Sequence, residues 1–443
     1  MFISGCEANQ NKLRTLTLFG GTICVTVRKI DTDSGDVVAK AKLSDFTRLH
    51  QHAGLSFDEA IALIKVSKST GYRYQAGISK PTALALEVLQ KAADERTAET
   101  PGWFRFIDLF AGIGGLRKGF EHIGGRCIFT SEWDKNSQIT YRNNYPDNHE
   151  IKGDVREFSE NPSLIPEHDV LLAGFPCQPF SLAGVSKKNS LGRKHGFLDE
   201  TQGTLFFDTA QIIAYHKPAA FVLENVKNLE SHDGGKTFKT IMKVLREELG
   251  YHVQSRVISS EPWVPQKRQR IFIVGFKNKT TFDFKSVTLP PASEGPKLAS
   301  ILEPEVDPKY TLTEHLWTYL QNYRKKHAAA GNGFGCSVFG PNDVTRTLSQ
   351  RYYKDGSEIL VDQPGNRPRR LTPRECARLM GFEHRDQGKP FILKDVSDTQ
   401  LYRQFGNAVV VPVVKFVATV LKPHLIQALN SQAQTPSRRA ANG

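Results

Sequence analysis

The stretch "FIDLFAGIGG", residues 106–115, joins an apolar run to a glycine-rich turn. The residues after it, "LRKGFEHI", have the apolar spacing of a helix. A strand, a glycine-rich turn and a helix in this order are typical of a doubly wound α/β fold. The bare backbone of Gly112, Gly114 and Gly115 would let a ligand approach the carboxyl end of the strand, with a purely structural turn as the alternative. The chain has no GxxxxGKS or GxxxxGKT motif, so this turn is not predicted to bind phosphate.

Downstream of this stretch, short apolar runs alternate with segments of helical spacing. The apolar runs occupy residues 104–110, 126–133, 168–175, 219–226 and 270–276, and the helical segments occupy residues 114–123, 135–145, 206–216 and 237–249. Strands that alternate with helices predict a parallel sheet covered on both faces. Residues 277–368 break the alternation and are irregular and rich in Pro, Gly and Lys. After them we expect a capped helix within residues 370–382, then a Gly-Asn turn that leads into an apolar helix within residues 400–425.

The first 100 residues differ from the rest. Residues 13–30 are rich in β-branched and aromatic side chains, and with "DTDSGD" (31–36) as a turn they predict a small hairpin. Residues 55–93 change to helical spacing, with Ser56 and Glu59 as a capping box. The spacing resembles a helix-turn-helix, with a simple helical hairpin as the alternative. Its second helix would direct four side chains at a major groove: Ser69, Tyr72, Arg73 and Gln75. A polar stretch ending in Pro-Gly, residues 93–103, reads as a linker.

Composition limits the class of protein. With 443 residues, 39% hydrophobic and 24% charged, the chain is long enough for two or three soluble domains. We see no secretion signal and no apolar run near the ~20 residues that span a bilayer. The six cysteines include no CxxC pair, so we expect no metal site and a reducing cytoplasm. The net charge of +13 favours a polyanionic partner, although it is also consistent with solubility alone.

Acidic and aromatic residues follow the predicted strand ends. Glu132 comes 20 positions after Gly112 (132 − 112 = 20), where an acid would hold ribose hydroxyls in this architecture. Trp133 offers a flat face to an adenine, and Asp154, at a third strand end, could accept a hydrogen bond from an adenine amino group. Together with the glycine-rich turn, these residues predict a nucleoside site.

Three further segments bring reactive side chains to the same edge. Cys177, in "GFPCQPF", is predicted to be a nucleophile that acts as its thiolate, against the alternative of an inert buried thiol. Glu224, at the end of "FVLENV", can hold or donate a proton on a ring nitrogen, or merely cap a helix. Arg268 and Arg270 alternate in an extended segment, so both guanidinium groups could enter one site. Arg270 would bind a carbonyl oxygen and Arg268 would support it or a phosphate, unless both lie on a solvated turn.

Nine ordered motifs carry a family resemblance: "DLFAGIGG", "SEW", "GDVR", "GFPCQPF", "GTLFFD", "LENV", "QKRQR", "RRLTPRECARLMGF" and "QFGNAVV". Over residues 104 to about 425 the chain resembles the DNA (cytosine-5) methyltransferase family. It is most similar to bacterial enzymes that modify short palindromes of the CC(N or W)GG type. The resemblance implies a Rossmann-like sheet that binds S-adenosylmethionine, a smaller irregular target-recognition domain and a helix-turn-helix-like N-terminal module. The domains implied are an N-terminal extension (1–100), a catalytic domain in two parts (101–276 and 369–430), a recognition domain (277–368) and a tail (431–443).

The resemblance also implies a reaction on a cytosine flipped out of duplex DNA. Cys177 would attack carbon 6, Glu224 would bind ring nitrogen 3 and the amino group, and Arg270 would hold the carbonyl oxygen, with Arg268 nearby. Carbon 5 would take the methyl group of S-adenosylmethionine, leaving S-adenosylhomocysteine, with no metal involved. The residues implied to bind the cofactor are Phe110, Ala111, Gly112, Gly114, Gly115, Glu132, Trp133, Asp154, Val155, Pro176, Leu205, Asn407 and Val409.

Contacts with DNA are expected from two further segments. The loop after the cysteine contributes Gln178, Ser181, Lys187, Lys188 and Arg193. The recognition segment contributes Arg346, Gln350, Arg351 and Lys354, each of which could instead be a solvated loop residue. A monomer in the cytoplasm is expected, with duplex DNA and an operator DNA as partners and no membrane. Two alternatives remain: the same chemistry on transfer RNA, and a DNA-binding repressor that uses the methylase half as a scaffold.

Overall fold

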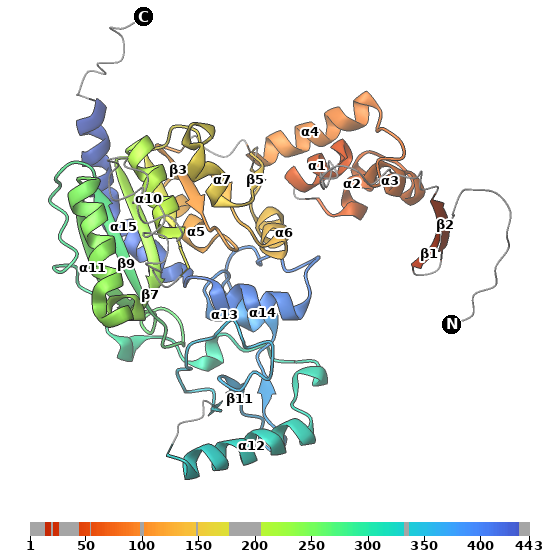
Figure 1. Ribbon diagram of the computed structural model, residues 1–443. Coiled ribbons are helices and arrows are strands. Elements are labelled where there is room, and N and C mark those ends of the chain that lie inside the picture. The colour runs from red at the N-terminus through yellow and green to blue at the C-terminus, as the bar shows by residue number, and fades with distance from the viewer. Residues whose placement is uncertain are drawn as a thin grey trace, which may run out of the picture. The chain divides into compact units, whose positions relative to one another are not determined.

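The computed structural model describes residues 14–18, 21–25, 44–53, 55–97, 102–147, 149–176, 205–331 and 336–433. The chain forms two compact units, residues 1–43 and residues 44–443 (Figure 1). Each unit is described by itself.

The first unit contains one antiparallel pair of strands. β1 (Arg14–Leu18) pairs with β2 (Gly21–Val25), and the register brings Leu18 opposite Gly21. The predicted hairpin is therefore present, but the position of its turn is wrong. The strands flank residues 19 and 20, whereas "DTDSGD" (31–36) lies outside the described residues.

The second unit begins with four helices, α1 (Asp45–His52), α2 (Phe57–Leu63), α3 (Lys68–Gln75) and α4 (Ala83–Thr97). The predicted capping box is confirmed, because Ser56 Oγ accepts from Glu59 N and Glu59 Oε2 accepts from Ser56 N at 2.6 Å. α3 begins at Lys68, with Ser67 as its cap, and it contains the four side chains expected on the second helix. A small core holds the helices together: Phe46, Leu49, Ala60, Ile61, Tyr74 and Leu89. Tyr72 is exposed on α3, and the helix-turn-helix reading stays a prediction.

A seven-stranded sheet forms the centre of the remainder, with the order β5-β4-β3-β6-β7-β9-β8. Its strands are β3 (Phe104–Leu109), β4 (Gly125–Ser131), β5 (Ile151–Lys152), β6 (Val170–Ala173), β7 (Ala220–Val226), β8 (His252–Ser259) and β9 (Gln269–Phe276). The five strands from β5 to β7 are parallel, as predicted.

At the β9 end the prediction of an all-parallel sheet is wrong. β9 runs antiparallel to both β7 and β8, and the sequence reading missed β8. Only residues 260–268 join β8 to β9, which is too short for the crossover that parallel neighbours need. This reversal has a functional consequence, because it places the start of β9, and therefore Arg270, beside the end of β7.

Helices cover both faces of the sheet (Figure 1). On one face lie α5 (Gly115–His122) and α15 (Val411–Ala433), packed on alternate strand residues such as Phe106 and Leu172. The other face packs residues such as Ile107 and Leu171 against the remaining helices. These helices are α7 (Val155–Glu160), α10 (Leu205–His216) and α11 (Lys236–Lys243), which continues as a π-helical turn, Val244–Glu248. α6 (Lys135–Asn144) connects β4 to β5.

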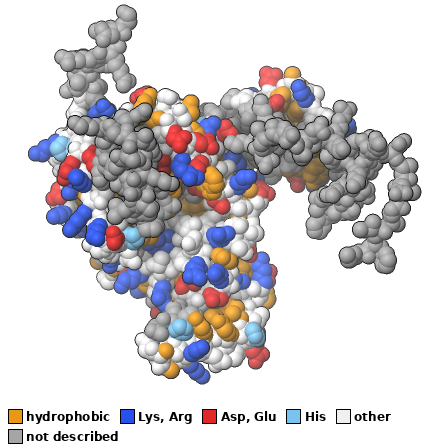
Figure 2. Space-filling view, viewed as in Figure 1, with side chains coloured by type: hydrophobic (Ala, Val, Ile, Leu, Met, Phe, Trp, Pro, Cys, Tyr) orange, Lys and Arg blue, Asp and Glu red, His pale blue; other side chains and the backbone are white. Residues whose placement is uncertain are grey.

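The part between β9 and residue 370 is more ordered than its sequence predicts. Short 3₁₀ turns surround one long helix, α12 (Glu314–Ala329), and a small sheet of β10 (Val338–Phe339), β11 (Leu360–Val361) and β12 (Arg369–Arg370). α12 was missed, although Leu316, Trp317 and Leu320 have helical spacing and pack on Cys336 and Leu360. Figure 2 shows Lys and Arg side chains gathered on this part of the molecule.

Two helices, α13 (Pro373–Leu379) and α14 (Asp398–Asn407), follow the small sheet in sequence. α13 has the predicted cap, a box formed by Thr372 and Glu375. α14 corrects the predicted Gly-Asn turn, because Gly406 and Asn407 end a helix instead of opening a turn. Gly406 is needed there for space, since a Cβ would lie 2.4 Å from the backbone nitrogen of Gln350.

The apolar stretch of α14 and α15 is longer than the sequence reading assumed. By length and composition, Asp398–Ser431 could cross a membrane, but half of its most apolar window is buried in the protein. Its side chains, among them Val414, Val417 and Leu421, belong to the same core as α5. We therefore interpret it as a core segment.

Acid is expected to destabilise the fold through His168, just before β6. The ring is 5% exposed, its Nδ1 lies 2.9 Å from the carbonyl oxygen of Pro166, and it packs against the ring of His216. Burial, opposed by the Pro166 carbonyl and assisted by His216, lowers the pKa of His168 from 6.5 to about 4. Because the pKa of His168 is lower in the folded than in the unfolded protein, the neutral ring favours the folded state. This stabilisation is complete above pH 6.5 and is lost as the pH falls towards 4. The loss corresponds to about 3 kcal/mol.

The measurement is urea unfolding at pH 7, 5 and 4 for the wild type, His168→Asn and a control at the exposed His122, His122→Gln. We expect the stability advantage of the wild type over His168→Asn to shrink by about 3 kcal/mol between pH 7 and 4. The His122→Gln difference should stay constant. An advantage of the wild type over His168→Asn that does not change with pH would show that His168 is not the responsible group.

Candidate active site

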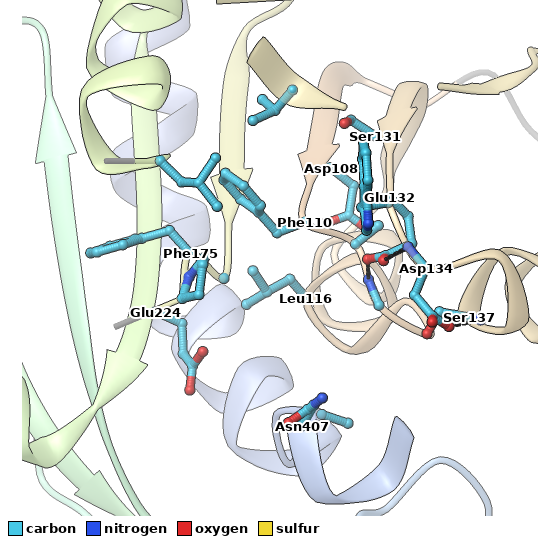
Figure 3. A pocket seen from close by; sticks show the side chains of 18 of the residues that line it. Asp108, Phe110, Leu116, Ser131, Glu132, Asp134, Ser137, Phe175, Glu224 and Asn407 are labelled. Carbon is cyan, nitrogen blue, oxygen red and sulfur yellow. Dashed lines mark hydrogen bonds between the residues drawn. The ribbon is translucent and has the colours of Figure 1, made fainter. Parts of the chain in front are cut away.

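A cavity of about 1260 Å³ opens at the carboxyl ends of β3, β4, β6 and β7. The sheet order changes direction between β3 and β6, which is where doubly wound sheets bind their ligands. Figure 3 shows Glu224 on one side of the cavity, Glu132 and Asp134 on the other, and Asn407 below them. The site is thus built from both the first and the last segments of the catalytic part.

The three glycines of the turn between β3 and α5 have different surroundings. Gly112 has φ of +55° and no atom within 4 Å of a Cβ position, so it faces open space in the cavity. Gly114 does not line the cavity, because its Cβ position meets the ring of Tyr145 at 2.3 Å. Gly115 packs against Val409. Gly112 and Gly115 therefore line the cavity, whereas Gly114 serves close packing, and the approach of a ligand to this turn stays a prediction.

The acid at the end of β4 fixes this turn. Glu132 Oε2 accepts a hydrogen bond from Gly112 N, and Oε1 accepts one from Asp134 N, both at 2.7 Å. Burial raises the pKa of Glu132, and these two backbone donors oppose the rise. The next residue, Trp133, lines the cavity and is 71% exposed, so its ring face is available for stacking.

Asp154 caps α7 and is already paired. Its Oδ1 accepts from Arg156 N at 3.0 Å, and the guanidinium Nε of Arg156 lies 2.8 Å from Oδ2. The hydrogen bond from the Arg156 side chain holds the pKa of Asp154 below its usual value. A ligand amino group that bonds to this carboxylate would share it with Arg156.

The structure gathers almost all the predicted cofactor residues around one cavity. Those that line it are Phe110, Ala111, Gly112, Gly115, Glu132, Trp133, Asp154, Val155, Pro176, Leu205, Asn407 and Val409. Gly114 is the exception, as described above.

Glu224 and Arg270 form a buried pair beside this cavity. Arg270 Nε lies 3.1 Å from Glu224 Oε1, and the two side chains are 16% and 13% exposed. Burial raises the pKa of Glu224, and Arg270, followed by Arg268, opposes the rise. The carboxyl group therefore keeps its proton to a higher pH than an exposed glutamate, which suits it to donate a hydrogen bond or a proton.

Arg268 has a different environment from Arg270. It is 2% exposed, and its terminal nitrogens donate to the carbonyl oxygens of Leu348, Gly406 and Ala408. Both terminal nitrogens are thus engaged by the backbone, although Arg268 also lines the main cavity, and its support of a base or a phosphate stays a prediction. Alternation along the strand predicts that Arg268 and Arg270 point in the same direction. Of the two, Arg268 lies deeper, and backbone carbonyls surround its guanidinium.

The predicted DNA-contacting residues fall into three groups. Gln350 lines the main cavity. Arg346, Arg351 and Lys354 line a second cavity of about 850 Å³, together with Tyr323 and His327 of α12. The remaining residues, Gln178, Ser181, Lys187, Lys188 and Arg193, lie outside the described residues, as does Cys177.

Sequence reasoning missed polar residues on α7 and α10. Asp208 and Gln211 line the main cavity, and Ser159 Oγ donates to Asp208 Oδ1. Leu205, Asp208 and Gln211 are three residues apart, so helical spacing from Leu205 would have found them. Within the described parts of the chain, no three His, Cys, Asp or Glu side chains gather as metal ligands.

Three comparisons with known proteins show what this chain is similar to. The family profile described as C-5 cytosine-specific DNA methylase matches residues 104–423. A DNA-cytosine methyltransferase of Escherichia coli K12 is 52% identical over 380 residues, covering 75% of this chain and 80% of its own length. The type II methyltransferase M.DsaV of Dactylococcopsis salina is 49% identical over 320 residues, covering 71% and 84%. A crystal structure of DNMT2 from Spodoptera frugiperda is similar in fold, with a TM-score of 0.55, 21% identity and coverage of 72% and 99%.

Proposed function

The chain belongs to the C-5 cytosine-specific DNA methylase family and is a cytosine-5 DNA methyltransferase of restriction–modification type, and from this premise we propose its substrate site and mechanism. The proposal is that it methylates one cytosine of a short duplex palindrome after flipping that base out of the helix. The observation that carries it is the buried Glu224–Arg270 pair at 3.1 Å, which lies on the cavity that also holds the glycine-rich turn.

The types of residue that line the cavity are suited to bind S-adenosylmethionine. Gly112 offers open backbone, Trp133 offers an exposed ring face, and Glu132 and Asp154 offer acceptors to ribose hydroxyls and an adenine amino group. Val155, Leu205, Asn407 and Val409 would complete the pocket. When bound, the cofactor supplies an electrophilic methyl group and leaves as S-adenosylhomocysteine.

The residues of this chain would prepare the cytosine for that transfer. The thiolate of Cys177 adds to carbon 6, and the electron pair of the double bond moves to carbon 5 while nitrogen 3 takes a proton from Glu224. Arg270 holds the carbonyl oxygen and keeps Glu224 in place. After carbon 5 is methylated, its proton passes to a base, the double bond between carbons 5 and 6 re-forms as the bond from carbon 6 to sulfur breaks, and nitrogen 3 returns its proton to Glu224.

The substrate is proposed to be double-stranded DNA with a CC(N or W)GG-type site, modified by a monomeric cytoplasmic enzyme. The basic side chains around the second cavity, Arg346, Arg351 and Lys354, support a polyanionic partner. Tritiated methyl transfer into duplex DNA and into transfer RNA tests the substrate class. Label in DNA alone is expected, and label in transfer RNA alone would defeat the proposal. Bisulfite sequencing of DNA from cells that express the protein would then identify the site.

A second proposed role concerns α1 to α4. We propose that α3 binds an operator and regulates a neighbouring gene, in addition to methylation. This is supported by the exposed Tyr72 and by the Ser67-capped helix that carries Arg73. Arg73→Ala in the full chain should weaken promoter binding at least about tenfold in a gel shift, while a control at the exposed Lys80, Lys80→Ala, should change it little. Equal promoter binding by both variants would indicate that α3 belongs to a simple helical hairpin. Promoter binding without any methyl transfer would indicate a repressor that uses the methylase half as a scaffold.

A further inference from the structure

Arg268 lies where three distant segments of the chain meet. Its Nη1 donates to the carbonyl oxygen of Leu348 at 2.7 Å, and its Nη2 donates to those of Gly406 and Ala408 at 2.9 and 2.7 Å. It is one of the largest side chains in the protein that is fully buried. Its acceptors are backbone atoms, so what it fixes is the course of the chain around it.

The first of these segments leads to Gln350, which the proposed function assigns to DNA. Residues 265–268 run beside residues 345–348, with Gln266 Oε1 accepting from Leu348 N at 2.8 Å and Lys267 N donating to the Thr345 carbonyl at 2.9 Å. Two residues beyond Leu348, Gln350 lines the main cavity. The position of Gln350 is therefore set from the start of β9.

The second segment completes the cofactor side of the cavity. Asn407 and Val409 line it, and each is next to a carbonyl that Arg268 holds. The two segments also touch directly, because the absent side chain of Gly406 leaves room for the backbone of Ser349 and Gln350. A shift of either segment must move the other or break these contacts.

A buried cation is a costly way to join three carbonyls. Its desolvation is unfavourable, and among the described residues Nε has no hydrogen-bond partner. An apolar side chain could fill the space but could not fix two segments at hydrogen-bond distance. The same strand places Arg270, two residues later, against Glu224. One residue thus links the cofactor side, the DNA side and the catalytic pair.

We infer that Arg268 is a positioning residue that couples the binding of the two substrates, so that an occupied cofactor pocket sets Gln350 and its neighbours for DNA. The inference rests on the proposed function. Coupled sites typically change each other's affinity by 5- to 150-fold, and by thermodynamic linkage the factor is the same in both directions. The prediction is that S-adenosylhomocysteine tightens binding of cognate duplex DNA about tenfold, and that this factor depends on Arg268 and Gly406.

The experiment measures the dissociation constant of a fluorescent cognate duplex by anisotropy, with and without saturating S-adenosylhomocysteine, on the full-length protein. The variants are Arg268→Lys, whose point-like ammonium cannot serve both segments, and Gly406→Ala, which pushes them apart. We expect both to lower the factor to below about threefold. The matched control is Arg256→Lys on β8, because Arg256 also donates to two backbone carbonyls, those of Phe284 and Val287, but does not line the cavity.

If Arg268 had a purely structural role, its replacement would lower stability and weaken DNA binding equally with and without S-adenosylhomocysteine. The ratio of these two dissociation constants would then stay unchanged, so this ratio is the deciding quantity. Thermal unfolding identifies any variant that fails to fold, and the reciprocal measurement of S-adenosylhomocysteine binding with and without DNA must give the same factor. A tenfold factor that persists in both variants, or a wild type without coupling, overturns the inference. A wild type that transfers no methyl group to DNA would instead defeat the proposed function.

Discussion

Cys177→Ala is expected to abolish methyl transfer, with a loss of at least about 10⁴-fold in kcat, while binding of duplex DNA stays within about twofold. The physical reason is that carbon 5 of cytosine is a poor nucleophile until a thiolate has added to carbon 6. Alanine removes the nucleophile and very little volume. The backbone before it is well placed, since Asn225 Nδ2 donates to the carbonyl of Phe175 at 2.8 Å and Pro176 lines the cavity.

The measurement is tritiated methyl transfer under single-turnover conditions, with DNA binding followed separately. The matched control is Cys336→Ala, a buried cysteine that lies outside the main cavity and should retain activity. A duplex that carries 5-fluorocytosine adds a direct readout, because the enzyme should be trapped on it through the peptide that contains Cys177. Turnover by Cys177→Ala above a few per cent of the wild type, or a trapped adduct on another residue, would assign the nucleophile elsewhere.

Glu224→Gln is expected to lower kcat by about 10² to 10⁴-fold. Glutamine preserves the shape and can donate a hydrogen bond to nitrogen 3, but it cannot transfer a proton there. Because burial raises the pKa of Glu224, the wild-type carboxyl group holds its proton to a higher pH than usual. The rate of the wild type should therefore fall as the pH rises through the raised pKa of Glu224, and this alkaline decline should be absent from the variant.

The measurement is kcat against pH for Glu224→Gln and for a control at the exposed Glu230, Glu230→Gln. The control should reproduce the wild-type rate and profile. Affinity for DNA and the melting temperature show whether the site is intact. If Glu224→Gln keeps both the rate and the alkaline decline, a different group protonates the ring.

The parts of the fold that sequence predicted are those where local pattern and tertiary role agree. The turn after β3, the alternation of strands and helices, and the caps of α2 and α13 all depend on residues a few positions apart. The antiparallel course of β9 was missed because strand direction depends on the length of a connection, and β8 had not been recognised. α12 was missed because the surrounding Pro, Gly and Lys content outweighed a helical pattern that was present.

The site shows the same division. Glu224, Arg270 and most of the residues predicted to bind the cofactor lie around one cavity, because each follows a strand or belongs to a motif. The correct environment of Arg268 was out of reach, because its three acceptors are 80, 138 and 140 residues away in sequence. Gly114 was assigned to ligand approach for a similar reason, since its constraint is the ring of Tyr145.

The cavity is completed by residues that are synthesised late in translation. Asn407 and Val409 line the same pocket as Gly112, and α15, which follows them, packs on α5 next to that turn. A nascent chain that has exposed everything up to α13 still lacks one wall of the pocket and the carbonyls that hold Arg268. A chain that ends after α13 is therefore expected to lack a complete pocket.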